Sequence, residues 1–89
     1  MTERYIEATL VRTVKAAGGF ALKLTSPGMA GVPDRLVLLP GGRVVFVEVK
    51  RPGEKPRPLQ CKRHRQISAL GFRVLTIDRI EAIQEVFGE

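Results

Sequence analysis

The sequence predicts an α/β protein built on one mixed sheet of about four strands, with helices packed against it. Short apolar runs bounded by Gly and Pro indicate the strands, and segments in which apolar residues recur every three or four positions indicate the helices. The predicted order along the chain is helix, strand, strand, strand, helix, strand, helix. A length of 89 residues suits a single domain, residues 1–89, with a modest core.

The first predicted helix runs from Glu3 to Ala17. Thr2 is placed to cap its N-terminus, where Glu3 also suits the positive end of the helix dipole. At about 100° per residue, one face of this helix collects the apolar side chains of Ile6, Leu10, Val14 and Ala17. Glu7 falls inside this apolar face, and the Gly18-Gly19 pair ends the helix.

Strands are expected next. Residues 20–25 (FALKLT) alternate as a half-buried strand does, with Phe20, Leu22 and Leu24 on the apolar face. A loop rich in Pro and Gly (SPGMAGVP) follows this strand. Residues 34–39 (DRLVLL) and 43–50 (RVVFVEVK) are then joined by the sequence PGG, which is typical of a β-hairpin.

The rest of the chain predicts a helix, a strand and a final helix. After a basic, proline-rich loop (RPGEKPRP), a helix extends from about Leu59 to Leu70, and Gly71 ends it. Residues 72–77 (FRVLTI) read as a further strand. Asp78 is placed to cap a last helix that runs to about Phe87, with Glu81 completing a capping box.

The net charge points to a class of partner. Fifteen Lys and Arg against nine Asp and Glu give +6, which favours a polyanion, most often nucleic acid. The scarcity of aromatic residues argues against a protein that stacks single-stranded bases. Cys61 is the single cysteine, which excludes a disulfide framework and a multi-cysteine zinc site. No apolar run reaches the roughly 18 residues of a membrane span, so we expect no membrane partner and a location in the cytoplasm of a bacterial or virus-infected host cell.

Charged residues interrupt the most strand-like part of the sequence. Asp34 begins one strand of the predicted hairpin, and Glu48 and Lys50 lie near the end of the other. Residues two apart in a strand share a face, so Glu48 and Lys50 point the same way, while Val47 and Val49 point into the core. Burying an unpaired charge costs several kcal/mol, so this group needs a compensating partner.

The position of Asp34 depends on the length of the hairpin loop. A loop of three residues (PGG) would pair Leu39 with Arg43 and place Asp34 directly across from Glu48, on the same face. A loop of two residues (GG) would shift the register by one and put the carboxylates on opposite faces. In the first register, both carboxylates and the Lys50 ammonium would form one cluster.

A divalent cation would remove the repulsion between Asp34 and Glu48, and Mg²⁺ favours such hard oxygen ligands. The peptide carbonyl of Val49 is placed to add a further ligand, and Glu7 to supply another, directly or through water. Lys50 is then positioned to orient or deprotonate a water molecule, or to offset the charge of a phosphate. Together these groups suit the hydrolysis of phosphodiester bonds.

These residues resemble the PD-(D/E)XK nuclease signature. Pro33-Asp34 matches its first half, and Glu48-Val49-Lys50 matches its second half. Within that superfamily the chain is most similar to the VRR-NUC group of virus-type replication-repair nucleases, whose members show a G-x-PD stretch, a strand ending in E-x-K and a helix opening with Gln. That Gln is Gln60 here, and Glu7 matches the Glu in the group's first helix.

The resemblance implies a restriction-endonuclease-like fold and a Mg²⁺- or Mn²⁺-dependent endodeoxyribonuclease. Carried over by position, the implied catalytic residues are Asp34, Glu48, Lys50 and Gln60, and the implied metal ligands are Glu7, Asp34, Glu48 and Val49. Short stand-alone members resemble Holliday junction resolvases in arrangement. This similarity implies branched DNA as the substrate and a homodimer as the active assembly.

The basic residues around the site predict the contacts with DNA. The expected nucleic-acid-binding residues are Lys23, Ser26, Arg51, Lys55, Arg57, Lys62, Arg63 and His64. We assign His64 no catalytic role, because a lone histidine is more often a surface or phosphate-contacting residue.

Simpler interpretations exist for several of these residues. Glu7 would also be explained by an ion pair with Arg4 or Lys15, and Gln60 by a place in the first turn of its helix. For the whole chain, the alternatives are a non-catalytic DNA-binding module with the nuclease fold and a purely structural interaction protein. The module would bind DNA without cutting it, whereas the structural protein would show no affinity for DNA even at low salt.

Overall fold

Four strands form one mixed sheet, as the sequence predicts. The computed structural model describes residues 1–88. Its elements, in chain order, are helix α1 (Glu3–Ala16), strands β1 (Phe20–Lys23), β2 (Arg35–Leu39) and β3 (Arg43–Val49), helix α2 (Pro58–Ala69), strand β4 (Arg73–Ile77) and the 3₁₀ helix η1 (Ile80–Phe87). The strands lie in the order β1-β2-β3-β4, with β4 parallel to β3 and the other pairs antiparallel.

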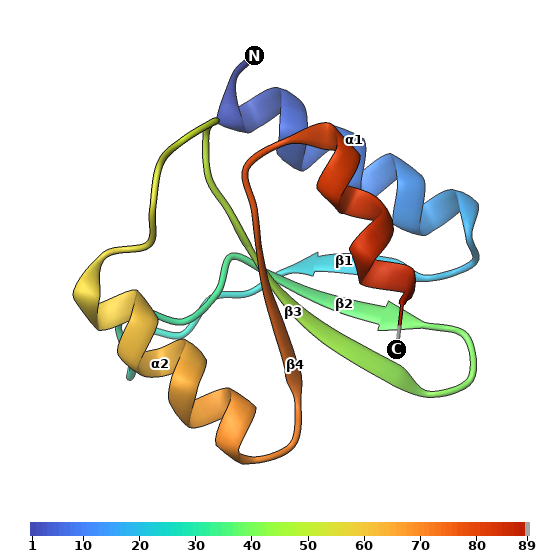
Figure 1. Ribbon diagram of the computed structural model, residues 1–89. Coiled ribbons are helices and arrows are strands. Elements are labelled where there is room, and N and C mark those ends of the chain that lie inside the picture. The colour runs from blue at the N-terminus through green and yellow to red at the C-terminus, as the bar shows by residue number, and fades with distance from the viewer. Residues whose placement is uncertain (89) are drawn as a thin grey trace.

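The helices divide between the faces of this sheet (Figure 1). Helices α1 and η1 lie together on one side, where they enclose the core, and α2 lies apart from them. The side chains that are almost fully buried in this core are Ile6, Leu10, Val14, Val37, Val45, Val47, Val49, Ile77, Ile83 and Val86. Val47 and Val49 therefore point into the core as predicted, and Glu48 between them points to the other face.

Helix α1 begins where the sequence predicts. The Thr2 hydroxyl accepts a hydrogen bond from the backbone N–H of Tyr5 at 3.1 Å, which confirms the N-cap. The predicted apolar face is also confirmed, except at its last position. The helix ends at Ala16, so Ala17 lies in the turn beyond it and is exposed.

Strand β1 shows the opposite facing from the one predicted. Phe20 and Leu22 are 64% and 46% exposed, whereas Ala21 is buried against α1. The register with β2 accounts for this facing, because Ala21 pairs with the core residue Val37, and successive strand residues alternate sides. A side chain at Gly19 would collide with the backbone carbonyl oxygen of Leu38 in β2 and come within 3.2 Å of Val14 in α1.

The hairpin has the three-residue loop of the first alternative. Gly41 and Gly42 adopt φ values of +83° and +77°, which favour glycine, and Leu39 pairs with Arg43. The register continues to the pair Arg35 and Val47. The next position on each strand is Asp34 on one side and Glu48 on the other, so the two acidic residues lie across from each other.

The last helix differs from the prediction in its type and its cap. It is a 3₁₀ helix preceded by Arg79, which makes no side-chain capping bond, so the proposed capping box of Asp78 and Glu81 is wrong. Asp78 instead accepts a hydrogen bond from the backbone N–H of Gly53 at 3.2 Å, because its side chain turns toward the loop after β3. Within residues 1–88, no helix combines the length and apolar character that crossing a membrane requires.

Candidate active site

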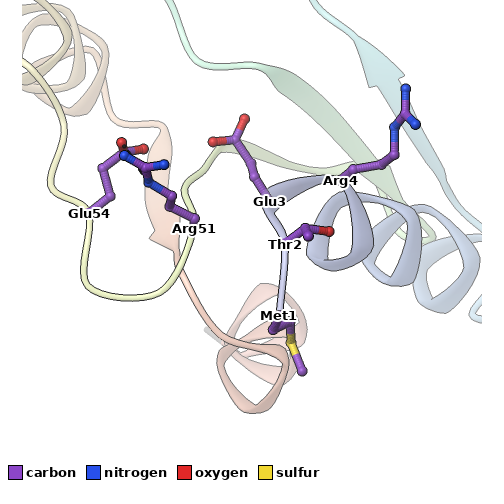
Figure 2. A pocket seen from close by; sticks show the side chains of 6 residues that line it. All are labelled: Met1, Thr2, Glu3, Arg4, Arg51 and Glu54. Carbon is purple, nitrogen blue, oxygen red and sulfur yellow. Dashed lines mark ion pairs between the residues drawn. The ribbon is translucent and has the colours of Figure 1, made fainter.

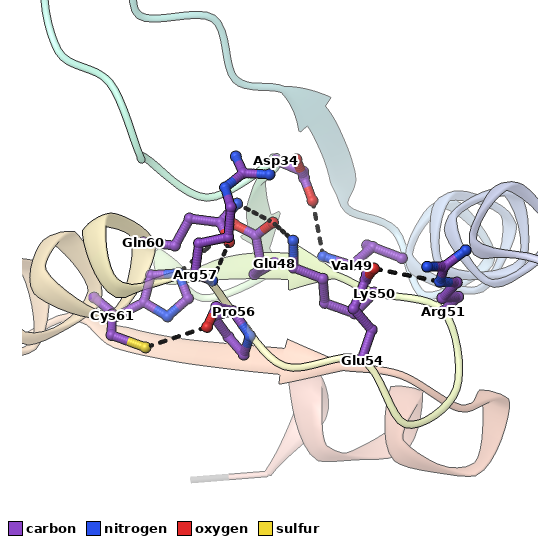
Figure 3. A network of polar contacts seen from close by, with 11 residues as sticks. Asp34, Glu48, Val49, Lys50, Arg51, Glu54, Pro56, Arg57, Gln60 and Cys61 are labelled. Carbon is purple, nitrogen blue, oxygen red and sulfur yellow. Dashed lines mark hydrogen bonds and ion pairs between the residues drawn. The ribbon is translucent and has the colours of Figure 1, made fainter.

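Asp34, Glu48 and Lys50 meet at the end of the hairpin, on the sheet face opposite the core (Figure 3). Glu48 is 1% exposed, and the Lys50 ammonium nitrogen lies 3.5 Å from Glu48 Oε2. Asp34 Oδ2 accepts a hydrogen bond from the backbone N–H of Val49 at 2.9 Å. Buried charged side chains are therefore gathered where the sequence places them, and only part of their charge is compensated by the Lys50 contact.

Gln60 joins this cluster from the first turn of α2. Its Oε1 accepts a hydrogen bond from the backbone N–H of Arg57 at 2.8 Å, and its Nε2 donates to Glu48 Oε2 at 3.2 Å. The side chain is buried, and both ends of its amide are in use. Gln60 therefore caps α2 and holds Glu48 at the same time, and its catalytic role stays a prediction.

His64 follows Gln60 by one helical turn. Its Nε2 lies 3.6 Å from Glu48 Oε1, and neither atom has a hydrogen-bond partner among residues 1–88. From the sequence, this residue was expected to make DNA contacts alone. The signal that was missed is spacing, since residues four apart on a helix share a face, and placing Gln60 at the site also places His64 there.

The electrostatics of the cluster are unbalanced toward negative charge. Burial and, after it, the neighbouring Asp34 carboxylate together raise the pKa of Glu48 from its ordinary 4.5 to about 7, while Lys50 opposes the shift. Burial also lowers the pKa of His64 below its ordinary 6.5, helped by the positive charge of Lys50 and opposed by Asp34. Near neutral pH His64 is therefore a neutral imidazole beside a glutamate that ionises reluctantly.

Glu7 lies elsewhere. Its Oε2 accepts a hydrogen bond from Arg35 Nε at 2.9 Å, so its partner is Arg35 and not Arg4 or Lys15. Arg35 pairs with Val47, whose side chain is in the core, so this ion pair lies on the α1 side of the sheet. The contacts of Glu7 do not bring it to Glu48, and its role as a metal ligand stays a prediction.

The loop before Asp34 is packed against α2. Gly31 has a φ of +85°, and a side chain there would come within 2.9 Å of Leu59 Cγ. Arg63 Nε donates to the carbonyl oxygen of Ala30 at 2.8 Å, and Pro33 is buried. The glycine and proline of the GVPD stretch thus let the loop pass close to α2 and hold Asp34 at the site.

The basic residues predicted to bind DNA remain accessible for the most part. Arg51 pairs with Glu54 at 3.3 Å and is still 72% exposed at its side chain. The other exposed members of the predicted set are Lys23, Lys55, Arg57 and Lys62. Arg63, Ser26 and His64 are partly buried. Lys23 pairs in register with Arg35, which places it on the α1 side, away from Glu48.

A hollow of about 510 Å³ lies beside the start of α1 (Figure 2). It is lined by Met1, Thr2, Glu3, Arg4, Arg51 and Glu54. Its lining includes Arg51, which directly follows Lys50, but not the acidic pair. The chemically distinctive groups are therefore not in this hollow but on the sheet face next to α2.

The donor groups of the site suit a hard divalent cation. In the part of the chain that the structure describes, no group of three or more His, Cys, Asp or Glu is arranged to hold a metal ion. The available ligands are the carboxylates of Asp34 and Glu48 and the peptide carbonyl of Val49, an oxygen-only set that matches the preference of Mg²⁺. Glu48 Oε1 is buried and has no hydrogen-bond partner in the described part of the chain, so it keeps lone pairs for such an ion.

Comparisons with known proteins agree with this geometry. No family model matches the chain. The curated protein "Putative nuclease p44" of Acyrthosiphon pisum secondary endosymbiont phage 1 is 53% identical over 76 residues, which cover 85% of this chain and 82% of that protein. A solved structure described as a VRR_NUC domain aligns with a TM-score of 0.89 at 30% identity, over 98% of this chain and 96% of that one. The chain belongs to the VRR-NUC nuclease family.

Membership of the VRR-NUC family confirms the resemblance and the fold inferred from the sequence. In this VRR-NUC chain the GVPD stretch leads into β2, the EVK triplet ends β3 and continues one residue beyond it, and Gln60 lies in the first turn of α2. The family signature therefore coincides with the buried polar cluster, which makes that cluster the candidate site of nuclease chemistry.

Proposed function

We propose that this VRR-NUC protein is a Mg²⁺- or Mn²⁺-dependent endodeoxyribonuclease that cleaves branched DNA as a homodimer in the cytoplasm of a bacterial or virus-infected cell. The observation that carries the proposal is the juxtaposition of half-buried Asp34 with buried Glu48 and Lys50 at the ends of neighbouring strands. Such a group is costly in a small protein unless a cation and a charged substrate compensate it. Its raised Glu48 pKa is also typical of functional sites.

Asp34, Glu48 and the Val49 carbonyl would hold the cation, with Glu7 as an outer ligand through water. The bound ion would supply Lewis-acid polarisation of the scissile phosphate. The hydrogen bond from the Val49 N–H to Asp34 fixes the aspartate, and the amide of Gln60 fixes Glu48. Both acidic ligands are therefore held before any ion arrives, which lowers the entropic cost of binding it.

Lys50 and Gln60 have distinct proposed roles. The Lys50 ammonium lies on the same side of the strand as Glu48 and is positioned to donate to a phosphate oxygen or to orient the attacking water. Both polar atoms of the Gln60 amide already have protein partners. Gln60 therefore acts on the water or phosphate indirectly, through its hydrogen bond to Glu48.

The proposed DNA contacts come from exposed basic residues near the site. Arg51, Lys55 and Arg57 lie in the loop after β3, and Lys62 lies on α2. Both segments flank the acidic pair, so a DNA backbone that follows them would bring a phosphate to Lys50. Branched DNA is proposed because a short single-site chain suits a dimer that cuts paired strands symmetrically.

An apolar strip on the sheet supports the homodimer. The strip consists of Phe20, Leu22, Leu36, Leu38, Phe46 and Phe72. The register pairs Phe20 with Leu38, Leu22 with Leu36 and Leu36 with Phe46, so these side chains share the face that carries Glu48. The ring of Phe72 packs edge-on against that of Phe46 at a centroid distance of 5.7 Å.

The size of the strip favours a second copy as its partner. Phe20 and Phe72 are 64% and 44% exposed. With a full Phe surface of roughly 150–250 Å², these side chains alone expose roughly 200 Å². That amount suits the apolar centre of an interface of about 800 Å² per partner. In a two-fold dimer the strip of one copy packs against the same strip of the other. The interface would then lie beside the two active sites, each of which cuts one DNA strand.

The decisive experiment is a cleavage panel. Four-way junctions, flaps, splayed arms and plain duplexes are incubated with the protein in Mg²⁺, in Mn²⁺ and in EDTA. Metal-dependent nicking, strongest on a branched substrate, is the expected result. Glu48→Gln and Lys50→Met should each reduce the single-turnover rate by a factor of about 100 or more. The exposed Lys15→Ala in α1 is the matched control and should cut like the wild type.

DNA binding measured in parallel separates the rival functions. The wild type and the inactive variants should bind with similar affinity, with a log–log salt slope well below zero. Tight binding without products in any metal would identify a non-catalytic DNA-binding module. Absence of binding at low salt would identify a structural interaction protein.

A further inference from the structure

His64 lies beside the acidic pair. Its Nε2 is 3.6 Å from Glu48 Oε1, and both atoms are buried and have no hydrogen-bond partner within the residues that the structure describes. The two side chains are 15% and 1% exposed. A phosphate would find little of this imidazole at the surface, so its place in the fold does not suit a DNA contact.

Helix α2 presents one side chain to each oxygen of Glu48. Gln60 Nε2 donates to Oε2 at 3.2 Å, and His64 Nε2 faces Oε1. The spacing of one helical turn lets both side chains approach the same carboxylate. A carboxylate contacted at one oxygen can rotate about its last bond, whereas contacts at both oxygens fix its plane.

The remaining gap between the two atoms is small. A hydrogen bond between nitrogen and oxygen is about 2.9–3.0 Å long, so a shift of about 0.6 Å would close the contact. The neutral imidazole carries a single N–H, and with that hydrogen on Nε2 it donates directly to Oε1. A contact of this kind would satisfy both unpaired atoms.

We propose that His64 is a positioning residue that donates a hydrogen bond to Oε1 of Glu48 while Gln60 donates to Oε2, so that α2 orients this carboxylate toward Asp34 for cation binding. The proposal rests on the proposed metal-dependent function. Each carboxylate oxygen can accept more than one hydrogen bond or ion, so the bonds from His64 and Gln60 leave lone pairs for the cation. Groups that hold a metal-binding carboxylate from behind commonly change metal affinity 10–100-fold when they are removed.

The test is Mn²⁺ binding without DNA, measured by calorimetry and by electron paramagnetic resonance on the full chain. His64→Ala should weaken the affinity about 10–100-fold. His64→Gln, whose amide nitrogen reaches a position similar to that of Nε2, should restore it to within about threefold of the wild type. Ser68→Ala, one further turn along α2 and exposed, is the matched control and should leave the affinity unchanged.

The other outcomes count against the proposal, the proposed function or both. Wild-type affinity in His64→Ala would show that the imidazole does not position Glu48. Equal losses in His64→Ala and His64→Gln, together with a lower melting temperature in both, would reduce His64 to a packing residue. A wild type that binds no Mn²⁺ would overturn both this inference and the metal dependence. A wild type that binds Mn²⁺ but cuts no DNA would overturn the proposed function alone, and the variant affinities would still decide the role of His64.

Discussion

Asp34 Oδ2 accepts the backbone N–H of Val49 at 2.9 Å, so the aspartate before β2 is tied to the last residue of β3. The bond joins Asp34, a predicted metal ligand, to the backbone of Val49, whose carbonyl is another predicted ligand. It also satisfies a backbone donor at the point where the antiparallel pairing of β2 and β3 ends. Asp34 therefore has a structural role as well as a proposed catalytic one, and variants must be chosen to separate the two.

Asp34→Asn separates these roles, since the amide oxygen still accepts from Val49 but the charge is gone. The Asp34 carboxylate helps to raise the pKa of Glu48 to about 7, second to burial. We expect the pKa of Glu48 in Asp34→Asn to fall below that value and to stay above 4.5, because the burial remains. A carboxyl ¹³C titration by NMR in EDTA measures it. An unchanged pKa would mean that the two carboxylates do not interact.

The stability of the metal-free protein should fall as pH rises through the titration of Glu48. The folded pKa of about 7 lies above the ordinary 4.5, so folding favours the protonated form. The resulting stabilisation is fully present below pH 4.5 and is lost as pH rises through 7, an effect of up to roughly 3 kcal/mol. Urea unfolding in EDTA across this range measures it.

Glu48→Gln provides the comparison for that pH series, because it cannot ionise. Its unfolding free energy should vary less with pH than that of the wild type, and the difference should be greatest above pH 7. Parallel curves for the two proteins would show that Glu48 titrates with an ordinary pKa.

Gly31→Ala should destabilise the protein more than Gly41→Ala. Both glycines have a φ near +80°, at +85° and +83°. A side chain at Gly31 would meet Leu59 and Arg63 of α2, whereas one at Gly41 meets nothing within 4 Å. Backbone strain of about 1–2 kcal/mol is common to both variants, and Gly31→Ala should lose about 1–3 kcal/mol more. Chemical denaturation measures both, and equal losses would mean that α2 does not constrain the loop.

Phe20→Asp should convert the protein to a monomer without unfolding it, because Phe20 is 64% exposed in the single chain. Sedimentation equilibrium over a range of concentrations measures the change in mass. Leu70→Asp is the matched control, since Leu70 is 77% exposed at the end of α2 and outside the apolar strip. A wild type that is monomeric at every concentration, or a Leu70→Asp variant that dissociates equally, would contradict the proposed interface.

Much of the fold could be predicted because its signals are local. The spacing of Ile6, Leu10 and Val14 defines the buried face of α1, and the PGG loop limits the hairpin to a few registers. The register then decides which face carries Glu48, because successive strand residues alternate sides. The position of the acidic pair on the face opposite the core thus follows from the loop, although the sequence left two loop lengths open.

The errors concern contacts between distant segments. Phe20 and Leu22 were expected on the buried face, but the register that pairs Ala21 with the core residue Val37 turns them to the other face. Asp78 has the sequence position of a helix cap, yet it bonds to Gly53 from another loop. The partner of Glu7 is Arg35, 28 residues away. Local sequence patterns carry no information on contacts between residues so far apart in the chain, so these side-chain partners could not be predicted.

Helix α2 buries one residue among those described, Gln60, which bonds to Glu48 of the site. It has no apolar stripe comparable to that of α1, whose Ile6, Leu10 and Val14 are fully buried. Its amide protons should accordingly exchange with deuterium sooner than those of α1. A cation bound at Glu48 would fix the contact between Glu48 and Gln60 and so slow that exchange. Cation binding would then be measurable as slower amide exchange along α2, although this helix supplies no ligand to the ion.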